Sequence, residues 1–118
     1  METGIQLETI SGGEEAQLLQ RAVQHVMDLT KDQIMLVDLG GGSIEVTLLE
    51  DGKIKFAESF RMGTVRMLKM FPFHPNKEKA FLKWTEYYVD DFIDFLNQRM
   101  GKSKLEQLVI TGGNATAL

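Results

Sequence analysis

One short run of residues, Asp38-Leu-Gly-Gly-Gly-Ser43, has the clearest chemical potential in this sequence of 118 residues. Four consecutive apolar residues, 34–37, come directly before it and predict a buried strand. Glycines let backbone N–H groups approach an anion without obstruction by side chains. A carboxylate at a strand end can hold Mg²⁺, and a serine hydroxyl can donate to a phosphate oxygen. The run therefore predicts a magnesium-phosphate cradle, and a tight glycine hairpin that binds nothing is the structural alternative.

Three glutamates are further candidates. Glu14 follows Ser11 at the spacing of a capping box, which explains it without a catalytic role. Glu15 could act as a general base if it faced a bound phosphate and a water, whereas a solvated acidic first helical turn is the ordinary explanation. Glu45 comes two residues after Ser43 and is either a second carboxylate near the same metal or water, or an exposed strand residue.

Another glycine pair, Gly112-Gly113, follows the apolar run 108–110 and Thr111. A strand that leads through two glycines into a helix start is a weak signal for an anion site, because helix N-termini bind phosphate. The alternative is close packing between strand and helix.

Three basic residues could form a small cluster around a glycine. Arg61, Arg66 and Lys69 lie on either side of Gly63 in the sequence. A solvated helix face is the ordinary interpretation, and contact with an anion is the other.

Hydrophobic periodicity predicts the elements that position these residues. In chain order they are a helix over 12–28, a three-stranded meander over 33–60, helices over 64–70 and 76–100, a strand over 107–111 and the start of a helix over 114–118. Alternation within the last meander strand predicts that Ile54, Phe56 and Phe60 share one side. A meander followed by a crossover helix and one more strand indicates an α/β fold with a mixed sheet and a right-handed crossover.

Composition excludes several classes of function. The chain has 13 Lys and Arg against 17 Asp and Glu, a net charge of −4 that argues against specific nucleic-acid binding. It has no cysteine, which excludes disulfides and thiol catalysis and fits a reducing, cytoplasmic location. No apolar run approaches the 18 residues of a membrane span, and the start lacks the pattern of a signal peptide.

Four motifs occur in a fixed order along the chain. They are Ile10-Ser-Gly-Gly-Glu-Glu-Ala16, Val37-Asp-Leu-Gly-Gly-Gly-Ser-Ile-Glu45, Met62-Gly-Thr-Val-Arg66 and Val109-Ile-Thr-Gly-Gly113. Together they resemble the exopolyphosphatase / guanosine pentaphosphate phosphohydrolase (Ppx/GppA) family over essentially the whole chain. The glycine-rich strand turn by itself also resembles heat-shock chaperones and sugar kinases of the actin-like superfamily. The Ser-Gly-x-Glu-Glu-Ala helix separates the phosphatases from them.

The resemblance implies a ribonuclease-H-like half of an actin-like ATPase fold. It also implies a hydrolase, dependent on Mg²⁺ or Mn²⁺, that removes the terminal phosphate of polyphosphate or the 5′ phosphate of guanosine pentaphosphate. By position, Glu15 matches the carboxylate thought to activate water, Asp38 the magnesium-associated aspartate and Glu45 a second active-site carboxylate. The positions that match phosphate-binding loops are Gly40, Gly41, Gly42 and Ser43, with Gly112 and Gly113 as a further pair. Departures from the family pattern are Ala22, Thr64 and Asn114, of which Asn114 weakens the assignment of that further pair.

The resemblance also implies that this chain is a single partial domain, over 1–118, from the second actin-like subdomain. Family members begin with another subdomain that carries its own phosphate loop, and the site forms in the cleft between the two halves. We therefore expect an N-terminal subdomain to be missing and the isolated chain to turn over little or no substrate. The alternatives are a regulatory module that binds a nucleotide or an alarmone such as guanosine tetraphosphate without hydrolysis, and a non-catalytic domain that keeps only the fold. The exposed edge of an incomplete sheet favours self-association, for example as a homodimer.

Overall fold

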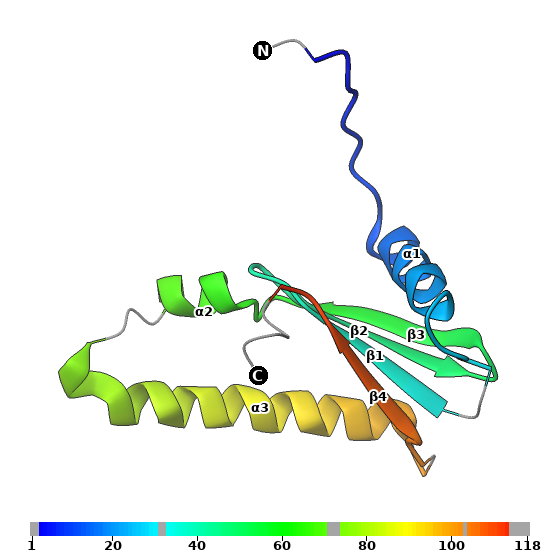
Figure 1. Cartoon of the computed structure of the whole chain (residues 1–118). Coiled ribbons are helices and arrows are strands. Elements are labelled where there is room, and N and C mark those ends of the chain that lie inside the picture. The colour runs from blue at the N-terminus through cyan, green and yellow to red at the C-terminus, as the bar shows by residue number, and fades with distance from the viewer. Residues whose placement is uncertain (1–2, 31–32, 71–73, 103, 114–118) are drawn as a thin grey trace.

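Four strands form one sheet with helices packed on both of its faces (Figure 1). The structure is a computed structural model that describes residues 3–30, 33–70, 74–102 and 104–113. Its elements are α1 (Gly12–Gln24), β1 (Gln33–Leu39), β2 (Ile44–Glu50), β3 (Lys53–Phe60), α2 (Thr64–Met70), the 3₁₀ turn η1 (Pro75–Lys77), α3 (Glu78–Met100) and β4 (Gln107–Thr111). The helix start expected over 114–118 lies outside the described residues.

The strand order is β3-β2-β1-β4. β1 and β2 are antiparallel, as are β2 and β3, whereas β4 runs parallel to β1. The parallel pair requires a long crossover between β3 and β4, and α2 and α3 lie within it. The predicted mixed sheet, a meander followed by a crossover helix and a further strand, is confirmed.

Each face of the sheet has its own apolar core. On one face, Ile34 and Leu36 pack with Val23 of α1. On the other face, Met35 and Leu48 pack against the C-terminal half of α3. The continuous apolar run of β1 therefore follows from burial on both sides, because alternate side chains enter different cores.

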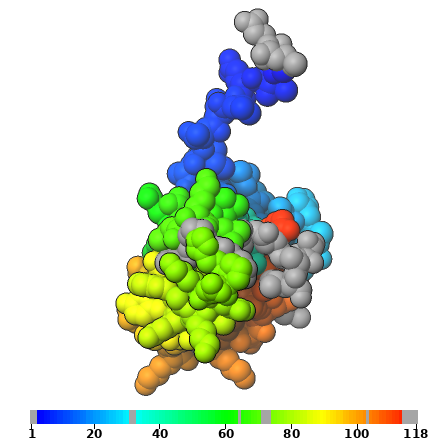
Figure 2. Space-filling model, turned by 90° about the vertical axis from the view of Figure 1, so that its left-hand side faces the viewer, coloured from blue at the N-terminus to red at the C-terminus, as the bar shows by residue number. Residues whose placement is uncertain are grey.

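The N-terminus of α1 is fixed by the expected capping box. The Ser11 side chain accepts a hydrogen bond from the Glu14 backbone N–H, and the Glu14 carboxylate accepts one from the Ser11 backbone N–H at 2.8 Å. Residues 3–10 precede this cap as an exposed extended segment that projects from the body of the molecule (Figure 2). The cap explains why the helix begins where the sequence predicts it to begin.

The predicted end of this helix is wrong, because α1 ends at Gln24 rather than at residue 28. The N–H of Val26 already donates to Val23 O, three residues back, so the last turn tightens and the chain leaves the helix. As a result Val26 is 83% exposed, and Leu29, which follows the helix, is 1% exposed in the core.

The aromatic residues of α3 lie only partly in the core. Phe92 and Phe95 stack edge-on against Phe60 of β3, with ring centroids 4.9 Å apart in both pairs. The N-terminal half of the helix extends past the sheet (Figure 1), and there Trp84 is 49% and Tyr87 60% exposed. The helix ends at Met100, before Gly101 with its positive φ of 61°, as predicted. Within the described residues, no helix is long and apolar enough to cross a membrane.

A β-bulge changes the facing of β3. The register pairs Leu49 with Ile54 but Leu48 with Phe56, so Lys55 is an extra residue on β3. Ile54 consequently packs with the α1-side core, whereas Phe56 and Phe60 pack with the α3-side core. The expectation that these three apolar residues share one side is wrong, because the bulge interrupts the alternation.

Candidate functional site

A row of four polar residues crosses the whole sheet near the ends of β1 and β4. The register pairs Ser59 with Glu45, Glu45 with Asp38, and Asp38 with Thr111. Directly opposed residues point to the same face of a sheet. Asp38 is two residues from Leu36, which lies in the α1-side core, so the polar row lies on the α1 face. Sequence reasoning selected Asp38 and Glu45 separately, and the register makes them direct neighbours.

Hydroxyl groups hold both carboxylates of this row. The Thr111 hydroxyl donates to Asp38 Oδ1 at 2.9 Å. The Ser59 hydroxyl donates to Glu45 Oε1 at 3.1 Å, and the Ser43 hydroxyl donates to the same oxygen. Ser43, which the sequence assigns to a phosphate, is therefore engaged with Glu45 in this structure. The contacts orient two carboxylates on neighbouring strands, where opposed Cβ atoms are typically about 4.5–5.5 Å apart.

The glycine run forms a tight turn between β1 and β2. The Gly40 N–H donates to Ser43 O at 3.0 Å and closes the turn. The Gly41 carbonyl accepts hydrogen bonds from the N–H groups of Val65 and Arg66, at 2.9 and 3.1 Å. Gly42 is exposed, and a Cβ built on it would meet nothing within 4 Å. The start of α2 thus supports one side of the turn, and Gly42 leaves backbone accessible on the other.

Gly63 allows α2 to lie against the turn. A Cβ at this buried position would lie 2.3 Å from the Gly41 carbonyl carbon, a distance that no side chain tolerates. The sequence offered Gly63 only as part of a supporting motif. Its packing role becomes visible once the 40–43 turn and α2 are placed side by side.

The glycine pair after β4 lies beside the same strand end. Gly112 has a φ of +103°, and a Cβ on it would lie 2.4 Å from Leu39 O and 2.9 Å from Asp38 Oδ1. A Cβ on Gly113 would meet nothing within 4 Å. For Gly112 the structure therefore supplies a packing reason, since the chain passes too close to β1 for any side chain. An anion site at Gly112 and Gly113 stays a prediction, because the helix expected after them is not among the described residues.

Glu15 lies on α1 and is not one of the four residues of the polar row. It is exposed in the first turn of α1, where its N–H donates to Ser11 O at 3.0 Å. α1 packs on the sheet face that carries Asp38 and Glu45, so the three carboxylates share one side of the molecule. No hydrogen bond among the described residues joins Glu15 to the other two, and its role as a base stays a prediction.

Sequence reasoning missed the two hydroxyl donors, Thr111 and Ser59. Thr111 could have been found by aligning the two apolar strands that end in glycines, because parallel pairing brings their ends together. Ser59 could not be found in this way, because its place opposite Glu45 depends on the bulge.

The donor atoms of the row suit a hard divalent cation. Asp38 and Glu45 supply carboxylate oxygens, and Ser43 and Thr111 supply hydroxyls. Among the residues that the structure describes, no group of three or more His, Cys, Asp and Glu could hold a metal ion. Mg²⁺ is usually bound by one or two carboxylates, and water and phosphate oxygens fill its other coordination positions. The residues therefore fit Mg²⁺ or Mn²⁺ bound together with a phosphorylated substrate.

Comparison with known proteins shows the family to which the chain is similar. The model of the Ppx/GppA phosphatase family matches residues 1–111. Exopolyphosphatase 1 of Mycobacterium tuberculosis is 32% identical over 68 residues, which are 58% of this chain and 20% of that protein. The crystal structure of an exopolyphosphatase from Cytophaga hutchinsonii superimposes with a TM-score of 0.78 and 27% identity, over 92% of this chain and 35% of that one. The present chain thus spans about a fifth of the curated relative and about a third of the solved structure.

A more distant likeness concerns the fold alone. The apo psk41 ParM protein superimposes with a TM-score of 0.58 at 17% identity, over 75% of this chain and 32% of that one. The mixed four-stranded sheet and its structural neighbours confirm the expected ribonuclease-H-like, actin-like fold. Since the family model covers nearly all of the sequence, the chain belongs to the Ppx/GppA phosphatase family.

Proposed function

We propose that this chain forms one wall of the active site of an exopolyphosphatase-type hydrolase, which releases the terminal phosphate of polyphosphate. The observation that carries the proposal is the direct opposition of Asp38 and Glu45 beside the 40–43 glycine turn. The opposite wall, with a second phosphate loop, comes from a further subdomain of a longer protein. The exopolyphosphatase relatives support the substrate class, and they are longer than this chain.

Asp38 and Glu45 are the residues that would hold a magnesium ion. When bound, the ion supplies positive charge that neutralises the phosphoryl oxygens during transfer. Thr111 fixes the rotation of the Asp38 carboxylate, and Ser59 and Ser43 fix that of Glu45. The protein therefore presents two pre-oriented carboxylates, which lowers the entropic cost of ordering the site.

The 40–43 turn receives the phosphate to be released. Gly42 is exposed with free space at its Cβ position, so a phosphate oxygen can reach the backbone there. The contacts of Gly41 with α2 hold the turn in place before substrate arrives. Ser43 donates to the phosphate only after its hydroxyl rotates away from Glu45.

Glu15 is the group we assign as general base. Its exposed carboxylate, on the same side of the sheet as Asp38, accepts a proton from water as the water oxygen attacks the terminal phosphorus. The P–O bond to the rest of the chain breaks, and the products are inorganic phosphate and a polyphosphate shorter by one unit. Deprotonation at the moment of attack makes water an adequate nucleophile near neutral pH.

The proposal is tested by phosphate release from polyphosphate, measured with Mg²⁺ on a longer protein that contains this chain and on the 118 residues alone. We expect Glu15→Gln to lower kcat by roughly 10²- to 10⁴-fold, the usual worth of a general base. Asp38→Asn should lower Mg²⁺-dependent activity strongly, because it removes a carboxylate that would hold the ion. Glu86→Gln, at an exposed position on α3, is the matched control and retains activity. Full activity of Asp38→Asn, or robust turnover by the 118 residues alone, would overturn the proposal. Tight binding of guanosine tetraphosphate without hydrolysis of any substrate would favour the regulatory alternative.

A further inference from the structure

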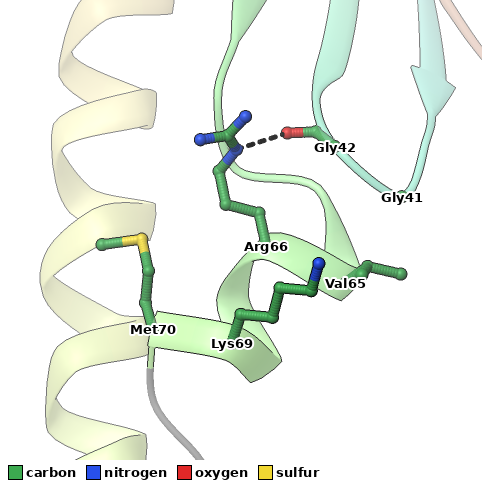
Figure 3. A pocket seen from close by; sticks show the side chains of 6 residues that line it. All are labelled: Gly41, Gly42, Val65, Arg66, Lys69 and Met70. Atoms are coloured by element: carbon green, nitrogen blue, oxygen red, sulfur yellow. Dashed lines mark hydrogen bonds between the residues drawn. The ribbon is translucent and has the colours of Figure 1, made fainter.

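A surface hollow of about 560 Å³ lies beside the tip of the glycine turn, next to α2 (Figure 3). It is lined by Gly41, Gly42, Val65, Arg66, Lys69 and Met70. The turn therefore borders two different places, the polar row at its base and this hollow at its tip. None of the groups assigned to the reaction above uses the side chains of Arg66 or Lys69.

Two cationic side chains reach into this hollow. Arg66 Nε donates to Gly42 O at 3.1 Å, which fixes the guanidinium against the turn through one of its three nitrogens (Figure 3). Lys69 projects from the next turn of α2, with its ammonium directed toward the same end of the helix as Val65 (Figure 3). A guanidinium held by its Nε keeps its terminal N–H groups for a ligand, and those groups match the oxygens of a phosphate.

The local charge around the hollow is opposite in sign to the net charge of the chain. Residues 59–77 contain four of the 13 Lys and Arg and none of the 17 Asp and Glu. The acidic residues that flank this segment are Glu58, which pairs with Arg99 on α3, and Glu78. Although the whole chain has a net charge of −4, the segment 59–77 is positively charged and attracts polyanions.

The backbone at the start of α2 does not provide the binding groups. The N–H groups of Val65 and Arg66 are already engaged by Gly41 O, and the helix has only seven residues. Any anion in the hollow is therefore held by the Arg66 and Lys69 side chains. Val65 and Met70 supply the apolar part of the wall.

We infer that Arg66 and Lys69 form a subsite for the phosphate groups of a linear polyphosphate that lie beyond the reacting one. The inference rests on the proposed function, because it requires the terminal phosphate to lie at the 40–43 turn. The chain of the substrate then passes the turn and reaches the hollow, where two cations bind successive phosphates. Such a subsite makes affinity depend on substrate length, because a short polyphosphate ends before it reaches these side chains.

The test is binding of long-chain polyphosphate and of tripolyphosphate to the 118-residue chain, measured calorimetrically with Mg²⁺, where the long chain should bind more tightly, and again in a chelator. Without metal, the two carboxylates of the polar row repel phosphate, so the remaining affinity reports on the basic hollow. We expect Lys69→Gln to weaken long-chain binding by roughly two- to fivefold, the range for one charged contact at a surface. Arg66→Gln should weaken it at least as much, and Arg66→Lys should lie between wild type and Arg66→Gln. Lys83→Gln, on α3, is the matched control and should bind like wild type.

The outcomes separate this inference from the proposed function. Unchanged long-chain affinity in both Lys69→Gln and Arg66→Gln, or no long-chain binding by the wild-type chain, overturns the subsite whatever the hydrolytic activity of the longer protein. Equal weakening of poly-glutamate binding also overturns it, since the hollow would then be a general polyanion surface. Conversely, an absence of hydrolysis in the longer protein, with length-dependent binding intact, overturns the catalytic proposal and leaves the hollow as a polyphosphate-binding surface.

Discussion

Glu45 and Ser59 face each other across β2 and β3, and the Ser59 hydroxyl donates to Glu45 Oε1 at 3.1 Å. This pairing depends on the extra residue of the bulge in β3. The Asp51-Gly52 turn sets the initial register, in which Glu50 pairs with Lys53. Continued without a bulge, that register would place a second carboxylate, Glu58, opposite Glu45. One extra residue therefore replaces a repulsive pair of like charges with a hydrogen bond.

The same bulge gives Glu58 a favourable position on the other face of the sheet. There its carboxylate lies 3.2 Å from Arg99 Nη2 on α3. The pair is at the surface and contributes little to stability by itself. The extra residue instead places the two carboxylates on opposite faces of the sheet, so that Glu45 lies in the polar row and Glu58 contacts α3.

The first prediction concerns the Ser59 hydroxyl. We expect Ser59→Ala to lower the free energy of unfolding by about 1 kcal/mol, the usual worth of one hydrogen bond, and to weaken Mg²⁺-dependent phosphate binding because Glu45 loses an orienting contact. Urea unfolding and calorimetry measure the two effects. Ser59→Thr keeps the hydroxyl and is the control, so equal losses in the two variants would contradict the prediction.

Most of the fold could be predicted from the sequence, but the bulge in β3 could not. Apolar runs and glycines locate the strands because burial and turn formation depend on residues close together in the chain. The insertion of Lys55 is decided by long-range packing, since it moves Phe56 and Phe60 toward α3 and leaves Ile54 facing α1. The alternation of apolar and polar residues along the strand therefore does not predict the bulge. The early end of α1 has a similar cause, because burial of Leu29 requires the chain to leave the helix first.

For the site, the sequence selected the residues but not their relationships. Asp38 and Glu45 were recognisable as carboxylates beside a glycine turn, whereas their direct opposition became visible only in the antiparallel register of β1 and β2. The hydrogen bond of Thr111 to Asp38 joins residues 73 positions apart and required the parallel pairing of β4 with β1. Whether Glu15 faces this row could not be predicted from the sequence, because it depends on how α1 is docked on the sheet.

The second prediction contrasts two glycines of the turn region. Gly63→Ala should cost more than about 2 kcal/mol of unfolding free energy, because its Cβ would overlap the Gly41 backbone. Gly42→Ala should fold with nearly wild-type stability, since its Cβ meets nothing within 4 Å. Thermal unfolding measures both.

Gly42→Ala also tests the phosphate loop. A methyl group at this exposed backbone position should obstruct phosphate and reduce Mg²⁺-dependent binding at least severalfold while the protein stays folded. Unimpaired phosphate binding by a stable Gly42→Ala variant would show that the turn is only a hairpin.

The third prediction concerns the glycine pair after β4. Gly112→Ala should destabilise the protein by more than about 2 kcal/mol, because its φ of +103° disfavours a side chain and its Cβ would lie 2.4 Å from Leu39 O. Gly113→Ala is the matched control, with no atom within 4 Å of its Cβ. Comparable melting temperatures for the two variants would show that β4 ends differently from the structure.

The last prediction concerns acid stability at the start of α1. The Ser11 backbone N–H and hydroxyl donate to the Glu14 carboxylate and lower the pKa of Glu14 below its ordinary value of 4.5. A carboxyl group whose pKa is lower in the folded state contributes stability that is fully present above its unfolded pKa. That contribution disappears as the pH falls from 4.5 through the lower folded pKa, because the protonated carboxyl no longer accepts both hydrogen bonds. Urea unfolding across this interval should therefore show a smaller acid-dependent loss in Glu14→Gln than in wild type, and Glu86→Gln should behave like wild type. A loss of the same size in wild type and Glu14→Gln would mean that the capping box does not hold the ionised carboxylate in solution.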